Sequence, residues 1–277
     1  MNDISRQATL LQLSDGTGRT GRCLARTQSL TIECVAGDGS TPFDFASATE
    51  IILLLPAQGA AVSGDHAADI PGHAVAILPA GAYALRLAAR GEAYILATDR
   101  LDRLADEAIN AEDYAQRDAR IEPLGRPFGK PRNPDGIRIY PVEDIAIPPD
   151  NGRLRFLQSE TMSVNWVEYN GVRDRDALSP HAHDDFEQAT LAISGHFLHH
   201  VRTPWGRNAN LWREDAHLPA APHSVVIVPP EIVHTTEGVG DGLHILIDIF
   251  APPRRDFIAK NWVFNAADYT DPIEIAL

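Results

Sequence analysis

Residues 224–234 read Ser-Val-Val-Ile-Val-Pro-Pro-Glu-Ile-Val-His, an apolar run that enters a proline turn and leaves it as a second apolar run. Valine and isoleucine favour strands, and proline prevents such a run from continuing as a central strand. The same layout occurs at residues 77–84, Ile-Leu-Pro-Ala-Gly-Ala-Tyr-Ala. A further apolar run follows each copy, at 91–97 and at 242–248. These two copies predict a duplicated β unit.

Short β-rich runs bounded by glycine, proline or aspartate recur along the chain, whereas helical periodicity is scarce. The chain is therefore predicted to be all-β. One short helical segment is expected at residues 101–120, where strong helix formers are dense. The expected strands are residues 29–35, 50–55, 74–78, 92–97, 163–169, 189–193, 224–228 and 243–250.

A change of composition divides the chain. Seven prolines lie between residues 123 and 149, which is typical of an extended connection. We therefore expect residues 1–122 to form a first β barrel with the helix, residues 123–150 to form a proline-rich linker, and residues 151–277 to form a second barrel.

Composition excludes several classes of partner. Lysine and arginine number 24 against 38 aspartates and glutamates, a formal charge of -14 that disfavours nucleic acid. The longest apolar runs, at 51–55 and 225–228, are far shorter than the ~20 residues of a membrane helix, so no membrane partner is expected. The first residues lack the pattern of a secretory signal, which predicts a cytoplasmic protein.

Histidines concentrate in the second half, where nine of the 11 lie between residues 181 and 244. Residues 180–188 read Pro-His-Ala-His-Asp-Asp-Phe-Glu-Gln, and in a strand His181 and His183 point to the same side. His234 ends the proline turn quoted above. Imidazoles placed in this way suit one divalent transition metal ion such as Fe, Mn, Zn or Ni.

The same residues resemble the two motifs of the cupin family. His181-x-His183, with six residues between Gln188 and Gly195, is similar to the first motif, and Pro229-Pro-Glu-Ile-Val-His234 is similar to the second. Together with the internal repeat, they make the chain resemble a bicupin. The resemblance implies two jelly-roll-like, double-stranded β-helix barrels, with one metal ion in the second barrel on three histidines and an oxygen ligand.

This sequence departs from the family motifs at two positions. Glu231 stands where the second motif has glycine, and the register of the first motif selects Gln188 where glutamate is usual. Glu187 is the alternative oxygen ligand, and only one of the two neighbours should reach the metal because adjacent strand residues face opposite sides. A neutral amide ligand leaves the ion more positive, which favours polarising a substrate oxygen.

The first barrel is expected to bind no metal. Ala84 stands where the second motif would place its histidine, and no His-x-His sequence precedes it. This degenerate barrel would then have a structural role, covering the other barrel or supplying the interface of a homodimer.

The strand after Gly195 carries two further candidates. His196 and His200 share one of its faces and are the expected catalytic acid/base groups, unless that face forms the barrel exterior.

A long loop lies between the two motifs. Residues 203–215 contain two tryptophans and two arginines, and loops at a barrel mouth commonly shape substrate access. Arg202, Trp205 and Arg213 are the expected substrate-binding residues; the alternative is a surface loop anchored by its tryptophans.

These features predict a metal-dependent enzyme acting on a small, oxygen-rich molecule such as a sugar acid or related carboxylate. The reaction expected is Lewis-acid assisted isomerisation or ring opening. An Fe(II)-dependent dioxygenase is the enzymatic alternative. A non-catalytic ligand-binding or sensor protein is the alternative from another class.

Overall fold

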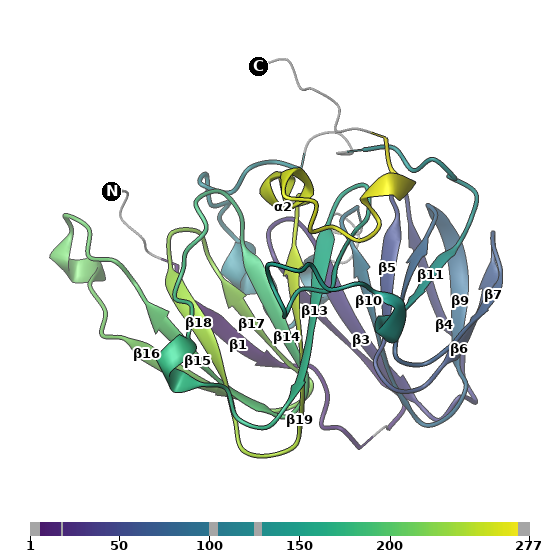
Figure 1. Ribbon diagram of the computed structural model, residues 1–277, viewed down its shortest axis with the longest axis horizontal. Helices are drawn as coiled ribbons and strands as arrows, with labels where there is room; N and C mark the ends of the chain where they lie inside the picture. The colour runs from purple at the N-terminus through teal and green to yellow at the C-terminus, as the bar shows by residue number, and fades with distance from the viewer. Residues whose placement is uncertain (1–5, 18, 100–104, 125–128, 271–277) are drawn as a thin grey trace.

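Four β-sheets make up most of the structure, a computed structural model that describes residues 6–17, 19–99, 105–124 and 129–270. They are arranged as two β sandwiches side by side, each with a six-stranded sheet and a smaller sheet (Figure 1). The predicted all-β class is confirmed, and every strand expected from the sequence overlaps an observed strand.

The first sandwich contains ten strands in two sheets, β11-β8-β5-β10-β3-β2 and β4-β9-β6-β7. These strands are β2 (Gly21–Arg26), β3 (Thr31–Gly37), β4 (Phe43–Ser47), β5 (Ile51–Leu55), β6 (Ala60–Gly64), β7 (Ala68–Ile70), β8 (Ala74–Leu78), β9 (Gly81–Leu87), β10 (Gly91–Ala97) and β11 (Arg138–Pro141).

The second sandwich contains nine strands in the sheets β1-β17-β14-β19-β13-β12 and β16-β15-β18. These strands are β1 (Thr9–Gln12), β12 (Phe156–Gln158), β13 (Ser163–Asn170), β14 (Gln188–Ser194), β15 (His196–Arg202), β16 (Ala216–Ala220), β17 (Ser224–Val228), β18 (Val233–Val239) and β19 (Leu243–Phe250). The short helix α2 (Arg255–Ala259) follows β19.

The two sandwiches repeat one topology. The order β8-β5-β10-β3 in the first large sheet has its counterpart in β17-β14-β19-β13 of the second. The strand β8 and the strand β17 carry the two copies of the repeat that the sequence shows at residues 77–84 and 227–234. The internal similarity of the sequence therefore corresponds to equivalent strands in space.

Two strands cross the domain boundaries expected from the sequence. β1, near the N-terminus, pairs with β17 of the second sandwich, where Thr9 is the register partner of Ile227. β11, within the proline-rich region, pairs with β8 of the first sandwich, where Arg138 is the partner of Ile77. Both are edge strands, the positions in a sheet that tolerate nearby proline.

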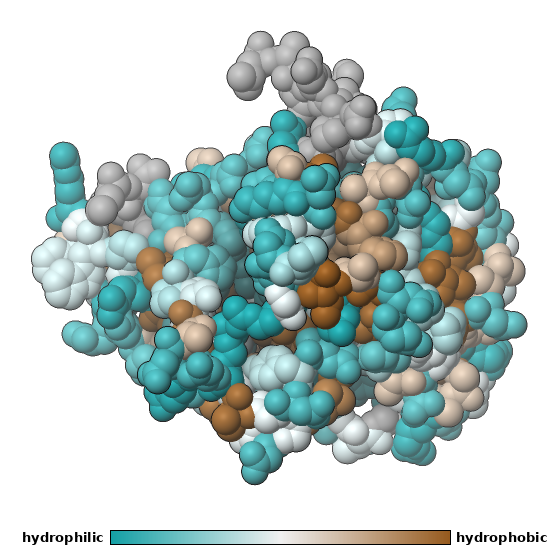
Figure 2. Space-filling model, in the orientation of Figure 1, coloured by the Kyte–Doolittle hydropathy of each residue, from teal (hydrophilic) through white to brown (hydrophobic). Residues whose placement is uncertain are grey.

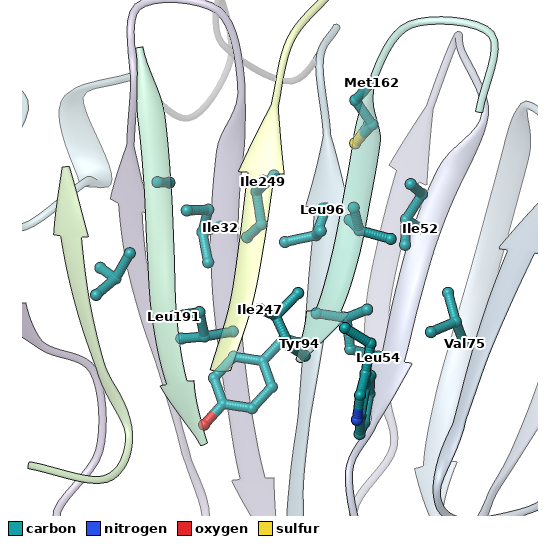
Figure 3. Packing of buried hydrophobic residues seen from close by; sticks show 14 of the residues in the cluster. Ile32, Ile52, Leu54, Val75, Tyr94, Leu96, Met162, Leu191, Ile247 and Ile249 are labelled. Carbon is teal, nitrogen blue, oxygen red and sulfur yellow. The ribbon is translucent and has the colours of Figure 1, made fainter. Parts of the chain in front are cut away.

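The largest apolar core lies between the two six-stranded sheets. Ile52, Leu54 and Leu96 from the first sandwich pack against Leu191 and Ile247 from the second (Figure 3). Each large sheet is consequently buried on both faces, which explains why its central strands are continuous apolar runs. The two sandwiches share one core, and neither is an independent body.

The interior of the first sandwich is filled by apolar side chains. Phe43, Phe45, Tyr83 and Leu85 pack between its two sheets, and Ala84 lies on the other face of β9. This packing places no histidine from the described residues in that interior.

The helix expected at 101–120 is replaced by two short 3₁₀ segments, Ala105–Glu107 and Ala111–Tyr114, in the part of this stretch that the structure describes. Residues 101–104 lie outside the described residues. The other 3₁₀ segments are Val142–Asp144, Arg175–Ala177, Ala209–Leu211 and Ala266–Asp268. Asn110 explains the break, because its side chain hydrogen-bonds both backbone groups of Arg26 in β2.

Hydrophilic residues predominate on the face shown in Figure 2, where apolar residues form separate patches. Within the described residues, no helix has the length and apolar character needed to cross a bilayer.

Candidate metal centre

Two segments distant in sequence bring three histidines together in the second sandwich. His181 and His234 form an isolated antiparallel bridge, with backbone N–H···O distances of 3.0 and 2.8 Å. One candidate ligand atom from each of His181, His183 and His234 lies within 4.8 Å of the others. The backbone ladder therefore holds the imidazoles in one cluster.

The turn before His234 is built around Glu231. Its backbone has a φ of 67°, in the left-handed region, which explains why the related motif has glycine here. The Glu231 N–H donates to His183 O at 2.6 Å. This bond ties the proline turn to the loop that carries the other two histidines.

Backbone carbonyls orient two of the imidazoles. His181 Nδ1 donates to Ser179 O at 2.9 Å, and His234 Nδ1 donates to Ile232 O at 3.0 Å. With the protons on Nδ1, each Nε2 carries a free lone pair. A carbonyl behind the imidazole is the usual arrangement of a metal-bound histidine.

Gln188 presents its carbonyl oxygen to this cluster. Its Nε2 donates to Thr190 Oγ1 at 2.8 Å and to Asp248 Oδ1 at 3.1 Å, which orients the amide. Gln188 Oε1 then lies 2.8 Å from His183 Nε2 and 3.3 Å from His234 Nε2. Asp248 therefore decides which end of the amide faces the histidines.

The donor set fits a metal cation. Burial lowers the pKa of His183 to about 3 and that of His234 to about 4, so both are neutral near pH 7. The lone pair of His234 Nε2 then faces the lone pairs of Gln188 Oε1 at 3.3 Å, and a cation between these two acceptors would stabilise the arrangement. Three imidazole nitrogens and one amide oxygen suit a divalent transition metal ion.

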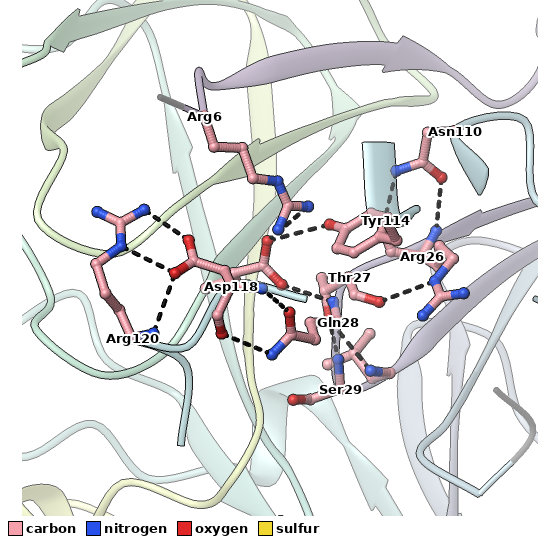
Figure 4. A network of polar contacts seen from close by, with 11 residues as sticks. Arg6, Arg26, Thr27, Gln28, Ser29, Asn110, Tyr114, Asp118 and Arg120 are labelled. Atoms are coloured by element: carbon pink, nitrogen blue, oxygen red, sulfur yellow. Dashed lines mark hydrogen bonds and ion pairs between the residues drawn. The ribbon is translucent and has the colours of Figure 1, made fainter. Parts of the chain in front are cut away.

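Glu187 faces away from the cluster. Its carboxylate is buried, lies 3.1 Å from Arg6 Nη2, and accepts hydrogen bonds from Gln28 N at 2.6 Å and Tyr114 Oη at 3.1 Å. These contacts belong to the polar network of Figure 4, which connects the first sandwich to the loop before β14. Of the two alternative oxygen ligands, the structure brings only Gln188 to the histidines.

A cavity of about 360 Å³ opens beside the cluster. Arg153, Arg173, Arg254 and Lys260 give its wall positive charge. Arg254 is paired with Asp256 at 2.6 Å. The cavity is therefore lined both by the histidine cluster and by positively charged side chains.

The fold can now be compared with known proteins. No family model and no curated protein matches the chain. Among solved structures, a serine-to-alanine variant of oxalate decarboxylase from Bacillus subtilis matches with a TM-score of 0.58 at 12% identity, covering 91% of this chain and 78% of the other. A second oxalate decarboxylase structure, from a study of proton-coupled electron transfer, matches with a TM-score of 0.57 at 13% identity and the same coverage.

The chain has a bicupin fold. At this sequence identity, the similarity shows only the arrangement of the two barrels. The chemistry has to be inferred from the residues of the site. A further similar structure, with a TM-score of 0.55, 12% identity and the same coverage of 91% and 78%, comes from a study of the Mn(II) centres of the Bacillus subtilis oxalate decarboxylase.

His196 and His200 are not among the residues that line this cavity, so their catalytic role stays a prediction that the site's geometry does not support. Along β15, Phe197 and Val201 are buried and His199 shares their face. Because side chains alternate, His196 and His200 point to the outer side of the barrel.

The loop between the motifs also lies away from the cavity of the bicupin. Arg202 pairs with Asp215, and Trp205 stacks on Trp212 with ring centroids 4.6 Å apart. Arg213 Nη1 donates to the carbonyls of Asn210 and Trp212. Both tryptophans are exposed, and none of Arg202, Trp205 and Arg213 lines the cavity, so their substrate-binding role stays a prediction that the site's geometry does not support.

Sequence reasoning missed three charged residues of the site. Arg153 and Arg173 lie in loops on either side of β12 and β13, where nothing in their spacing marks them. Asp248 carried a signal, because it is the one charged residue in the apolar run of β19 (Leu243–Phe250).

Proposed function

We propose that this bicupin is a metal-dependent enzyme that acts on a small carboxylate. The observation that carries the proposal is the pair Arg153 and Arg173, which line the cavity beside the histidine cluster. Neither forms an ion pair with a described carboxylate, and the Arg173 guanidinium donates only to the carbonyls of Thr236 and Ala177, at 3.4 and 3.5 Å.

The electrostatics of this pair favour an anion. Burial and the nearby positive charge of Arg153 both lower the pKa of Arg173, so the two guanidinium groups repel each other in a partly dry space. A bound carboxylate would remove the repulsion and accept charge-assisted hydrogen bonds. A sugar acid or a small dicarboxylate has the required charge, and oxalate decarboxylase is the enzyme named for the similar structures.

We assign His181, His183, His234 and Gln188 as the ligands of one divalent transition metal ion such as Mn, Fe, Zn or Ni. The bound ion would polarise a carbonyl or hydroxyl oxygen of the substrate. The chain's own contribution is a neutral set of four ligands, with Gln188 oriented by Asp248. The first barrel, whose interior is apolar, is proposed to hold no metal and to support the second.

The reaction we favour is an isomerisation or ring opening that uses no oxygen, because the four neutral ligands leave the full charge on the ion for polarisation. The test is a panel of sugar acids and small dicarboxylates, oxalate included, on protein loaded separately with Mn(II), Fe(II), Zn(II) or Ni(II). An isomeric product without oxygen uptake supports the proposal. Stoichiometric oxygen uptake would identify a dioxygenase, release of carbon dioxide a decarboxylase, and tight binding without turnover a sensor.

Arg153 and Arg173 provide a second test of the same proposal. Arg173→Gln should raise KM about 10-fold or more while kcat changes less, since the contact holds the carboxylate equally in ground and transition states. Arg175→Gln is the matched control, because the Arg175 side chain is exposed and contacts Glu237 outside the cavity. Equal effects of the two substitutions would contradict the assignment.

A further inference from the structure

A second pair of imidazoles lies on the outer face of the second barrel. His200 of β15 and His217 of β16 are direct register partners, and their Nδ1 atoms are 2.7 Å apart. The rings are inclined at 75° with centroids 4.9 Å apart. Together with Arg202, Asp215 and His234, they line a hollow of about 260 Å³, and His234 and Thr235 also line the cavity of Arg153.

Glu237 lies behind the ring of His200. The carboxylate of Glu237 is 8% exposed and lies 3.0 Å from His200 Nε2. Arg175 Nε lies 3.3 Å from the other oxygen of Glu237. The proton of a neutral His200 is therefore on Nε2, and the lone pair is on Nδ1, directed at His217. A carboxylate behind the ring is the arrangement that orients metal-bound histidines.

A carboxylate stands beside the pair. Asp215 is two residues before His217, and in an extended segment these side chains point the same way. Its oxygens pair with Arg202 Nε at 2.9 Å and Nη2 at 2.6 Å, and both side chains are exposed. Arg202 and His217 both lower the pKa of Asp215, so the carboxylate is charged and close to the imidazoles.

The spacing of the two nitrogens restricts the coordination geometry. With metal–nitrogen bonds of about 2.0 Å, two ligands at a right angle are about 2.8 Å apart, whereas tetrahedral ligands are about 3.3 Å apart. The observed 2.7 Å corresponds to the right angle. Square-planar or tetragonal geometry with nitrogen ligands is characteristic of Cu(II) and Ni(II).

We propose that His200 and His217 bind one Cu(II) or Ni(II) ion on the outer face of the β15–β16 hairpin. This proposal does not rest on the proposed enzymatic function, although His234 of the first cluster also lines the hollow. Glu237 acts as the positioning residue that keeps the lone pair of His200 directed outward.

The test uses the full chain freed of metal with a chelator and titrated with Ni(II), with bound metal counted after equilibrium dialysis. The background is the His181→Ala/His183→Ala variant, in which the other cluster is removed. One Ni(II) ion per chain is expected in that background, and His217→Ala added to it should weaken binding 10-fold or more. Absence of Ni(II) binding in the background variant would overturn the proposal.

A matched control separates ligation from a general effect of surface histidines. His196→Ala removes an exposed histidine on the same face of β15, opposite Val239, and should leave Ni(II) binding unchanged. The EPR spectrum of bound Cu(II) should show nitrogen hyperfine structure that is reduced in His217→Ala. An unchanged spectrum or unchanged affinity in His217→Ala would mean that the two imidazoles form only a hydrogen bond to each other.

Discussion

Arg120 Nη1 lies 3.3 Å from Glu231 Oε2, and the same nitrogen donates to Pro230 O at 3.0 Å. The rest of the guanidinium is held by Asp118 through two further hydrogen bonds. Asp118 in turn exchanges hydrogen bonds with Gln28 of the first sandwich. The first barrel therefore braces the strained turn that leads to His234 in the second.

Removal of the Arg120 side chain should weaken metal binding although it changes none of the proposed metal ligands. Arg120→Ala is expected to lower the affinity for Mn(II) or Zn(II) about 10-fold, the scale seen when a group behind a metal ligand is lost. Chelator competition measures the affinity, and Arg90→Ala serves as the control because its exposed side chain is remote from the turn.

Glu231→Gly provides the decisive comparison. Glycine adopts the left-handed backbone without strain, so the turn would depend less on its brace. Loss of Arg120 in the Glu231→Gly background should therefore cost clearly less affinity than in the natural sequence. Fully additive effects would show that Arg120 does not act through the turn.

Substitution of Gln188 should change the metal affinity, whereas substitution of Glu187 should change the stability of the fold. Gln188→Ala is expected to weaken metal binding 10-fold or more, since it removes the oxygen that faces the histidines. Glu187→Gln should leave the affinity nearly unchanged while lowering the free energy of unfolding by about 2 kcal/mol, because Arg6 loses a charged hydrogen-bond partner. Chelator competition and urea unfolding measure the two effects, and the reverse pattern would make Glu187 the ligand.

His199 should make the protein less stable in mild acid. Burial lowers the pKa of His199 to about 3, whereas an unfolded histidine titrates near pH 6.5. The unfolded state therefore binds a proton that the folded state does not, and stability is lost as the pH falls from about 6.5 toward 3. At pH 5 the expected loss from this residue is about 2 kcal/mol.

A variant isolates this contribution from that of the other histidines. His199→Asn keeps an acceptor for Thr236 and removes the titrating group, so the difference in unfolding free energy between pH 7 and pH 5 should shrink by about 2 kcal/mol. Urea unfolding at the two pH values measures it. An unchanged difference would mean that His199 becomes protonated in the folded protein.

The strand β1 should stabilise the second sandwich although it lies near the N-terminus. All four tryptophans lie between residues 166 and 262, so tryptophan fluorescence reports on the unfolding of the second half and of the core that it shares with the first. Deletion of residues 1–12 uncovers the edge of β17 and should lower the unfolding free energy seen by this probe by about 2 kcal/mol or more. If the deletion leaves the unfolding transition seen by tryptophan fluorescence unchanged, the pairing of β1 with β17 does not contribute to stability.

Much of the fold follows from local sequence, because strands that are buried on both faces must be apolar throughout. Phe197 and Val201 even indicate which face of β15 turns inward, a signal that the spacing of His196 and His200 alone does not contain. The pairing of β1 with β17 of the second sandwich could not be predicted, since the two strands are distant in sequence and edge pairing leaves no local pattern.

The candidate site likewise has a part that local sequence predicts and a part that depends on contacts between distant segments. The spacing of His181, His183 and His234 predicts a cluster, and the resemblance to the cupin motif selects Gln188; the structure brings these four side chains together. Arg153 and Arg173 were not, because they come from loops whose position depends on how the sheet closes. The turn at Glu231 was recognised as unusual, but its brace, Arg120, lies outside both motifs.

The pairing of β1 with β17 also bears on the order in which the protein can fold. Gln12 bonds to the backbone at His223, 211 residues later in the sequence, so β1 can pair only after the ribosome has made β17. Contacts between such distant residues slow folding, and unpaired strands of incomplete chains are prone to aggregate. Recombination that exchanges only the second barrel would separate β1 from its partner, so the two halves are expected to evolve as one unit.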